Sequence, residues 1–289
     1  MTMKTSERLR AILNTPGIHP VPGCYDALST LLARQAGFPL AFISGYGVAA
    51  SRFGLPDVGL ISGSEMTDTM RAIASGVPNY PFLADGDQGY GNAMNVRKTV
   101  VDYALAGAAG IMIEDQITPK RCGHLSGKEV VTRKEAKIRI RAAIEARTEN
   151  GMDIVIMART DALAVNGLDD ALSRLLDAQE EGADILFMEA MTTETQMEAF
   201  IKAVHKPACA NNFEGGRTPY LQRRRLEQIG FRLVIDPTFL FSATFTLQKH
   251  LRAFADNDET AYPPRVPFQD MAELLGIGIH TKIEGRYAR

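Results

Sequence analysis

Short apolar runs recur along this chain of 289 residues, and a helical pattern follows most of them. Near-continuous apolar runs are typical of parallel strands whose sheet is buried on both faces. Glycine stands just beyond several of the helical patterns, which is where helices commonly end. The apolar runs cover residues 19–22, 40–44, 80–85, 109–114, 154–159, 184–189, 207–211 and 232–236.

Eight strand–helix units within about 250 residues predict an α/β protein built as a (β/α)8 TIM barrel. A doubly wound sheet is the alternative arrangement of the same units. We expect residues 1–255 to form the barrel and to be the catalytic domain. Residues 256–289 lie beyond the eighth unit and contain a further helical pattern, so we expect a C-terminal helical extension that packs on a neighbouring subunit.

Composition excludes several classes of function. Apolar residues make up 45% of the chain, and the formal net charge is -2, so nothing indicates a nucleic-acid-binding surface. No apolar run approaches the roughly 20 residues that span a bilayer. We therefore expect a cytoplasmic protein with no membrane partner. The three cysteines match neither a disulfide framework nor a zinc site, and we expect them to be reduced.

Polar side chains stand where most of the predicted strands end. The carboxyl ends of barrel strands meet at one mouth, which is where barrel enzymes have their active sites. Acids, an arginine, an amide and a hydroxyl at these positions therefore predict a single polar site. The residues are Ser44, Asp85, Asp87, Glu114, Asp115, Arg159, Glu189, Asn211 and Asp236.

The segment Asp85-Gly86-Asp87 carries the strongest indication of a metal site. Carboxylate oxygens with room for water suit Mg²⁺ or Mn²⁺, and Glu114 on the next strand can complete the shell through water. The alternative is a solvated turn. Arg159 offers a planar fork for a substrate carboxylate, and the alternative there is a structural salt bridge with Asp161 or Glu189.

The loop of residues 118–131 is long, polar and basic. It contains Lys120, Cys122 and His124, and cationic surroundings favour a thiolate, so Cys122 is a candidate for acid–base chemistry. Glycines in the loop fit a lid over the site. The alternative is a basic surface loop. By contrast, we expect Cys24 and Cys209, which fall at the first and seventh strands, to be packing residues.

Together these segments resemble the isocitrate lyase/phosphoenolpyruvate mutase superfamily over nearly the whole chain. The resemblance implies a barrel, Mg²⁺, a 2-hydroxy or α-keto acid ligand, and a homotetramer with swapped C-terminal helices. Lys-Arg-Cys-Gly-His at residues 120–124 is similar to the loop of the lyase branch. The other matching segments are residues 22–27, 44–47, Asp57, 83–92, 113–115, 158–161 and 211–219.

The resemblance also implies roles for individual residues. Asp85 would bind the metal directly, and Asp57, Asp87 and Glu114 would act mostly through waters. Cys122 would protonate the leaving fragment, and Lys120 or Tyr46 would accept the hydroxyl proton. His124 would orient Cys122 or a carboxylate. The residues implied to bind substrate are Ser44, Gly45, Tyr46, Gly123, His124, Arg159, Glu189, Asn211, Phe213 and Pro237.

The substrate implied is a 2-hydroxy di- or tricarboxylate, of the 2-alkylmalate or 2-methylisocitrate type. Phe213 and Ser242 stand where 2-methylisocitrate lyases have a threonine and an arginine, and this favours a dicarboxylate. The stretch of residues 214–219 is similar to 2,3-dimethylmalate lyases and petal-death-type proteins. The alternatives are an oxaloacetate hydrolase, which Pro237 disfavours, an oxaloacetate decarboxylase, a phosphonopyruvate mutase, which Cys122 disfavours, and a non-catalytic metabolite-binding barrel.

Overall fold

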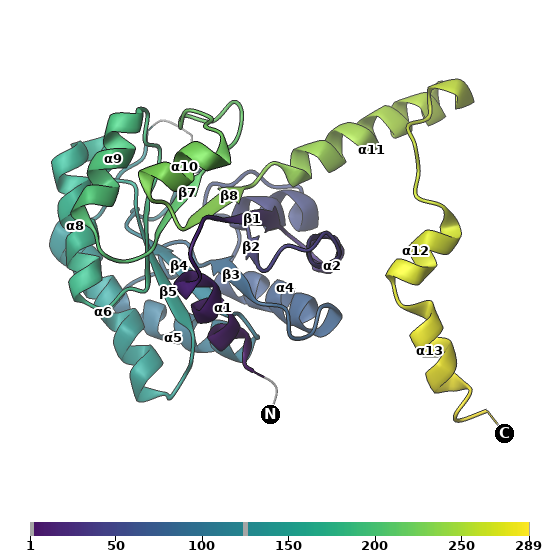
Figure 1. The fold of residues 1–289 in the computed structure, drawn as a ribbon, viewed down its shortest axis with the longest axis horizontal. Helices are drawn as coiled ribbons and strands as arrows, with labels where there is room; N and C mark the ends of the chain where they lie inside the picture. Colours follow the sequence, from purple (N-terminus) through teal and green to yellow (C-terminus); the bar gives the residue numbers. More distant parts are fainter. Residues whose placement is uncertain (1–2, 124–126, 289) are drawn as a thin grey trace. The chain divides into compact units, whose positions relative to one another are not determined.

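The computed structural model describes residues 3–123 and 127–288, and it contains a closed barrel of eight parallel strands (Figure 1). The strands follow one another around the barrel in chain order, and the last pairs with the first. The predicted (β/α)8 barrel is therefore confirmed, and the doubly wound sheet is excluded. The strands are β1 (His19–Cys24), β2 (Ala41–Ile43), β3 (Phe82–Asp85), β4 (Gly110–Glu114), β5 (Val155–Thr160), β6 (Ile185–Met188), β7 (Ala208–Asn211) and β8 (Leu233–Asp236).

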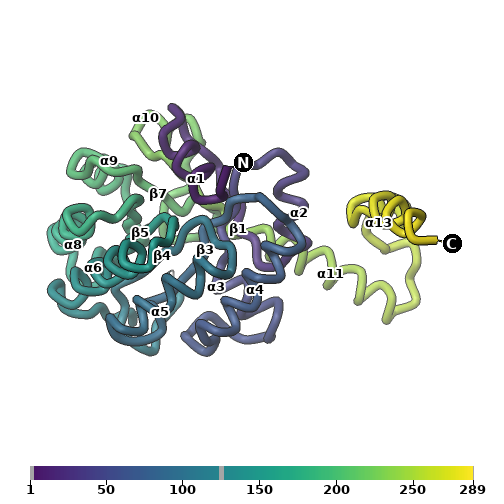
Figure 2. The backbone as a smooth tube through the Cα atoms, turned by 90° about the horizontal axis from the view of Figure 1, so that it is seen from below, coloured from purple at the N-terminus to yellow at the C-terminus, as the bar shows by residue number. Residues whose placement is uncertain are grey.

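Helices connect the strands and surround them (Figure 2). Several begin at the side-chain caps that their sequences supply: the Thr132 hydroxyl accepts a hydrogen bond from Glu135 N, and the Thr193 hydroxyl from Gln196 N. Around the barrel the helices are α1 (Thr5–Asn14), α2 (Ala27–Gln35), α3 (Gly45–Val48), the π-helical turn Ala49–Phe53, α4 (Gly63–Gly76), α5 (Ala93–Leu105), α6 (Arg133–Glu149), α7 (Leu163–Asn166), α8 (Leu168–Glu180), α9 (Glu194–Ala203) and α10 (Arg223–Ile229).

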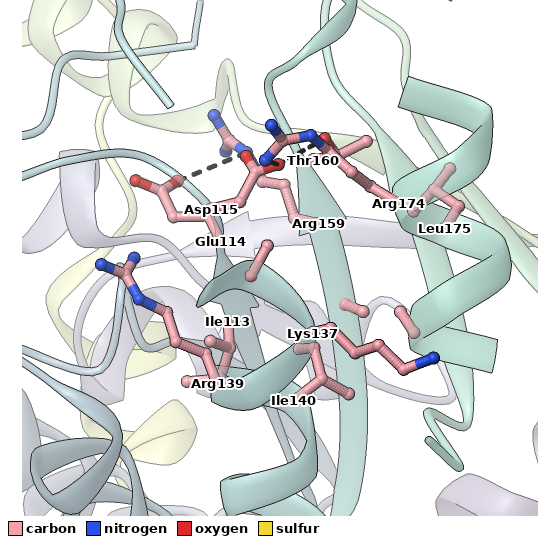
Figure 3. Close-up of a pocket in the computed structure, with 13 residues that line it drawn as sticks. Ile113, Glu114, Asp115, Lys137, Arg139, Ile140, Arg159, Thr160, Arg174 and Leu175 are labelled. Atoms are coloured by element: carbon pink, nitrogen blue, oxygen red, sulfur yellow. Dashed lines mark hydrogen bonds and ion pairs between the residues drawn. The ribbon is translucent and has the colours of Figure 1, made fainter. Parts of the chain in front are cut away.

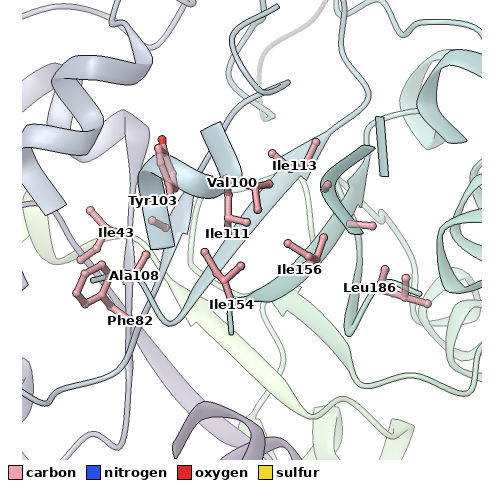
Figure 4. Packing of buried hydrophobic residues seen from close by; sticks show 14 of the residues in the cluster. Ile43, Phe82, Val100, Tyr103, Ala108, Ile111, Ile113, Ile154, Ile156 and Leu186 are labelled. Atoms are coloured by element: carbon pink, nitrogen blue, oxygen red, sulfur yellow. The ribbon is translucent and has the colours of Figure 1, made fainter. Parts of the chain in front are cut away.

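Successive residues of a strand enter two different cores. In β4, Met112 belongs to the cluster inside the barrel. Ile111 and Ile113 belong to the cluster between the strands and the surrounding helices (Figure 4). Because the strands are buried on both faces, their sequences are apolar along most of their length. The inner core holds the strands in a ring, and the outer core fixes the helices on it.

Helix α1 closes the N-terminal end of the barrel. Leu9 and Leu13 are buried and belong to the inner core, and Leu9 lies directly beside Gly110 at the start of β4. At the rim, Arg10 pairs with Asp153 and Asp184, the residues that precede β5 and β6. One end of the barrel is thus plugged, and the mouth at the other end is left for a site.

Residues 241–289 form a second compact unit, separate from residues 1–240. The unit begins within α11 (Phe239–Ala255) and contains a 3-10 turn (Glu259–Ala261), α12 (Phe268–Leu274) and α13 (Ile277–Glu284). It carries many exposed apolar side chains, among them Phe245, Phe254 and Phe268. Across the described ranges, no helix has the length and apolar character needed to cross a membrane.

Candidate active site

The polar residues predicted at the strand ends are buried together at the mouth of the barrel. Glu114 at the end of β4 stands opposite Arg159 of β5 in the sheet register, and the Arg159 Nε lies 3.4 Å from Glu114 Oε2. Glu189, directly after β6, lies 3.4 Å from Arg159 Nη1 and accepts a 3.0 Å hydrogen bond from Asn211 Nδ2 of β7. Four neighbouring strands therefore contribute to one connected polar cluster.

Arg159 is the charged centre of this cluster. Its guanidinium forms two hydrogen bonds with Asp161, from Nε at 2.9 Å and from Nη2 at 3.1 Å. Burial acts to lower the pKa of Arg159, but the negative charges of Asp161, Glu114 and Glu189 raise it well above its ordinary value. The side chain is thus a permanent cation. It is both a carboxylate-binding candidate and the salt-bridge partner that the sequence offered as the alternative.

Behind this cluster, a network on the outer side of the barrel braces the end of β5 (Figure 3). Asp115 accepts hydrogen bonds from the Thr160 hydroxyl at 2.6 Å and from Asp161 N at 2.9 Å, and Arg174 of α8 pairs with it at 3.2 Å. The cavity in this region has a volume of only about 20 Å³, enough for a single water molecule. Asp115 therefore supports the site from outside.

A second cluster gathers the acids proposed to hold the metal. Lys120 Nζ lies 2.5 Å from Asp57 Oδ1 and 2.7 Å from Asp87 Oδ1, with all three side chains buried. Asp85 accepts hydrogen bonds from Asp87 N and Gly45 N, both at 3.2 Å. Burial raises the pKa of Asp87 to about 6, although the charge of Lys120 opposes the shift. Lys120 thus acts as the counter-ion of this cluster.

The donor set fits a hard divalent cation. Within the two described ranges, no three His, Cys, Asp or Glu side chains converge closely enough to hold a metal by themselves. The Glu114 Oε1 atom is buried and has no hydrogen-bond partner there, and burial raises the pKa of Glu114 well above its ordinary value. An excess of buried carboxylates that accept few hydrogen bonds suits Mg²⁺ bound through one or two oxygens and several waters.

The turn after β2 lies against the acid cluster. Ser44 N donates to Cys24 O at 2.9 Å, so in this structure the main-chain N–H groups of Ser44 and Gly45 are engaged within the protein. A side chain at Gly45 would place its Cβ 2.9 Å from Asp85 Oδ2, which explains the glycine. Burial, with the charges of Cys122 and Asp57, raises the pKa of Tyr46.

The loop after β4 brings Cys122 to the mouth. A Cβ at Gly123 would lie 2.6 Å from Arg159 Nη2 and 2.8 Å from Glu189 Cδ, so the main chain next to Cys122 rests directly on the Arg159–Glu189 pair. Cys122 is half-buried and is not in a disulfide. The predicted site residue His124 lies outside the described residues.

Two residues that were not predicted as site residues, Gln116 and Lys128, support this loop. The side-chain amide of Gln116 donates to Arg121 O and accepts from Arg121 N, both at 2.9 Å. Lys128 Nζ donates to Gly123 O at 2.6 Å. Both side chains bind main-chain atoms, and a sequence shows no pattern for such contacts. The only signal was that Lys128 stands in the basic loop.

The remaining candidates follow β7 and β8. Phe213 is half-buried two residues beyond the end of β7. Pro237 follows β8, and its Cα would lie 2.7 Å from a Cβ at Gly23 of β1, which places it at the carboxyl end of that strand too. Cys24 and Cys209 are buried, and burial raises the pKa of both thiols, that of Cys24 to about 12.

These features define a barrel enzyme with an acid-lined mouth, a central arginine and a cysteine-bearing loop. Residues 9–255 match the family model described as phosphoenolpyruvate phosphomutase. The chain is 39% identical over 291 residues to the 2,3-dimethylmalate lyase of Eubacterium barkeri, with 99% of each chain covered.

Two solved structures are also similar to the chain. An oxaloacetate acetylhydrolase in complex with 3,3-difluorooxalacetate has a TM-score of 0.93 and 34% identity, covering 99% of this chain and 98% of the other. A phosphonopyruvate hydrolase in complex with oxalate and Mg²⁺ has a TM-score of 0.85 and 30% identity, covering 99% and 100%. The chain belongs to the phosphoenolpyruvate mutase/isocitrate lyase superfamily. The predictions of this family and of an enzyme of the oxo-acid lyase type are confirmed.

Proposed function

We propose that this protein is a Mg²⁺-dependent carbon–carbon lyase that cleaves a 2-hydroxy dicarboxylate of the 2-alkylmalate type. The products are an α-keto acid such as pyruvate and a simple carboxylate. The observation that carries the proposal is the packing of Gly123 on Arg159 and Glu189, because it brings the neighbouring Cys122 to a carboxylate-binding arginine beside the acid cluster. The 39% identity to a 2,3-dimethylmalate lyase supports this substrate class.

Arg159 is the proposed anchor for the substrate carboxylate, since a guanidinium can form two parallel hydrogen bonds with it. Glu189 and Asn211, which are hydrogen-bonded to each other, are proposed to bind the remaining oxygens. Phe213 adds apolar surface beyond Asn211. Together with Ser242 in place of an arginine, Phe213 favours an alkyl-substituted dicarboxylate over a tricarboxylate such as 2-methylisocitrate.

Asp85 would hold Mg²⁺ directly, and Asp57, Asp87 and Glu114 would hold it through waters. When bound, Mg²⁺ supplies positive charge that stabilises oxyanions forming on the substrate. A relative with 30% identity has a structure in complex with oxalate and Mg²⁺, which supports Mg²⁺ as the metal. The unpaired Glu114 Oε1 supports it from within this chain.

The proposed reaction is a retro-aldol cleavage. Tyr46 as its phenolate, or Lys120 after passing its own proton to Asp87 at 2.7 Å, accepts the proton of the substrate 2-hydroxyl, and the carbon–carbon bond then breaks to leave a keto acid. The electron pair of the broken bond moves onto the other fragment as an enolate. Cys122 protonates that carbon from its thiol, whose unperturbed pKa of about 8.5 suits proton transfer near neutral pH. His124 is proposed to orient Cys122 or a carboxylate.

We further propose that the enzyme works in the cytoplasm as a homotetramer. The exposed apolar side chains of residues 241–288 support burial against another copy of the chain. The net charge of -2 supports a small carboxylic acid, not a nucleic acid, as the partner.

Hydrolysis of oxaloacetate is the second candidate function. The TM-score of 0.93 to an oxaloacetate acetylhydrolase favours it, and Pro237, where such hydrolases tend to have a serine, opposes it. Decarboxylation of oxaloacetate and rearrangement of phosphonopyruvate rank lower, the latter because of Cys122.

A substrate screen tests the proposal. The purified protein is incubated with Mg²⁺ and, separately, with malate, 2-methylmalate, 2,3-dimethylmalate, 2-methylisocitrate, oxaloacetate and phosphonopyruvate. We expect keto acid from an alkylmalate and loss of the activity with EDTA. Formation of oxalate and acetate from oxaloacetate, without turnover of any alkylmalate, would contradict the lyase and establish the hydrolase.

A further inference from the structure

Lys128 is a buried lysine at the foot of the loop that carries Cys122. Its side chain is 1% exposed, and its Nζ donates to Gly123 O at 2.6 Å and to Asp161 Oδ1 at 2.7 Å. A buried ammonium group is costly unless it is well paired. Here the ammonium links a main-chain carbonyl of the loop to a carboxylate just beyond β5.

Asp161 in turn connects Lys128 to Arg159. The carboxylate is fully buried and accepts hydrogen bonds from Arg159 Nε and Nη2 as well as from Lys128. Burial acts to raise the pKa of Asp161, but the charges of Arg159 and Lys128 outweigh it and lower the pKa to about 2. Asp161 is thus a fixed anion shared between two cations.

Because Lys128 shares this carboxylate, more of the positive charge of Arg159 is available to a substrate anion. Arg159 already lies near Glu114 and Glu189, and a full share of Asp161 would leave little positive charge for an incoming anion. Lys128 neutralises part of Asp161, so more of the Arg159 charge remains at the mouth. By holding Gly123 O, the same ammonium group also fixes the main chain next to Cys122.

We infer that Lys128 is a positioning residue, which keeps Arg159 charged toward the substrate carboxylate and holds Cys122 at the mouth. The inference rests on the proposed function for its meaning in catalysis. Both effects of Lys128 can be tested without catalysis, because anion binding and the exposure of Cys122 can be measured without turnover.

The test compares Lys128→Met, which keeps length and removes charge, with Lys128→Arg, which keeps charge and changes geometry. Lys137→Met is the matched control, because Lys137 on α6 also pairs with carboxylates but is 30% exposed and outside the mouth. Two readouts are used: the Kd of oxalate in the presence of Mg²⁺ by calorimetry, and the rate of Cys122 carbamidomethylation by peptide mass spectrometry. Buried Cys24 and Cys209 are internal references for intact folding.

In Lys128→Met we expect oxalate binding to weaken and Cys122 alkylation to quicken. Each change should be about 10-fold or more, in the range for loss of a charge-assisted hydrogen bond. Lys128→Arg should recover oxalate binding better than the alkylation rate, and Lys137→Met should change neither. Values within about twofold of wild type for folded Lys128→Met would overturn the inference.

If Lys128→Met does not fold, Lys128→Arg is compared directly with wild type. Equal changes in the Kd of oxalate and in the Cys122 alkylation rate would then contradict the inference. If wild-type protein binds oxalate but cleaves no hydroxy acid, the proposed function fails and the inference about Lys128 is still tested. With an active enzyme, Lys128→Met should raise KM for the dicarboxylate and lower kcat. Lys128→Arg should restore KM more fully than kcat.

Discussion

The two ends of the barrel bury different kinds of side chain. At the N-terminal end, Leu9 and Leu13 of α1 fill the interior with apolar side chains, and the charges of Arg10 and its partners stay at the partly exposed rim. At the mouth, Glu114 and Glu189 are almost fully buried beside Arg159.

We attribute this difference to a division of roles, in which the plugged end stabilises the fold and the mouth carries the chemistry. Apolar burial stabilises a fold by about 25 cal/mol per Å², whereas each buried charge loses hydration that its partners only partly replace. We therefore expect substitutions at the plugged end to change the free energy of unfolding and to leave turnover intact. Substitutions at the mouth should lower turnover and change the free energy of unfolding little.

The largest expected effect is at the mouth. Cys122→Ser should lower the cleavage rate by about 10²- to 10⁴-fold, the usual range for a general acid–base group, with little change in Tm. Cys24→Ala, which alters a buried thiol of the outer core, is the matched control and should keep kcat. Steady-state kinetics and thermal melts measure both, and an unchanged kcat in Cys122→Ser would remove its proposed role.

At the plugged end, Leu9→Ala should lower the free energy of unfolding by about 2–5 kcal/mol, because Leu9 is fully buried in the inner core. The folded fraction should keep wild-type kcat. Leu105→Ala on the exposed face of α5 should change stability by less than about 0.5 kcal/mol. Chemical denaturation gives the free energies; a loss of kcat in folded Leu9→Ala would break the division.

Gly123→Ala should reduce kcat/KM by about 10- to 100-fold, because the new methyl group must displace Arg159 or Glu189 from the mouth. Gly76→Ala is the control, since its Cβ would meet only the Ala27 methyl, at 3.2 Å. Kinetics on both variants at equal folded fraction are the measurement. Full activity of Gly123→Ala would mean that the loop does not rest on Arg159 during turnover.

The smallest effect concerns the rim of the plugged end. Arg10→Met should cost less than about 1 kcal/mol of unfolding free energy, because the Arg10 side chain is 36% exposed and its pairs are screened by solvent. Denaturation at 0.05 and 0.5 M NaCl measures it, and the difference from wild type should shrink at high salt. A loss above about 2 kcal/mol would mean that charge, as well as apolar burial, stabilises this end.

The barrel was predictable because both faces of each strand are buried. All eight apolar runs proved to be strands, with ends shifted by at most a few residues. Helices α4 and α11 were not anticipated. The α4 sequence did carry a helix signal, since Ser62 and Glu65 form a capping box and Met66, Met70 and Ile73 repeat on one buried face. Most of α11 belongs to the second unit, where its apolar residues are exposed.

The candidate site was predictable where residue type alone carries the signal. Acids and an arginine at strand ends indicated the mouth, and the structure brings Glu114, Arg159 and Glu189 into contact. Gln116 and Lys128 could not be identified as supports from the sequence, because their partners include main-chain atoms of the loop and Asp161 just beyond the neighbouring strand β5. Such partners are defined only after the chain has folded.

Because β1 pairs with β8, the barrel of this enzyme can close only late in its synthesis on the ribosome. His19 is among the first residues of the barrel to emerge, and it pairs in register with Leu233 near its end. Contacts between such distant parts of a chain form slowly, since a long loop must close first. The nascent protein must therefore wait, with unpaired strand edges, until almost all of its barrel has been made, and this interval is when it most needs protection from aggregation.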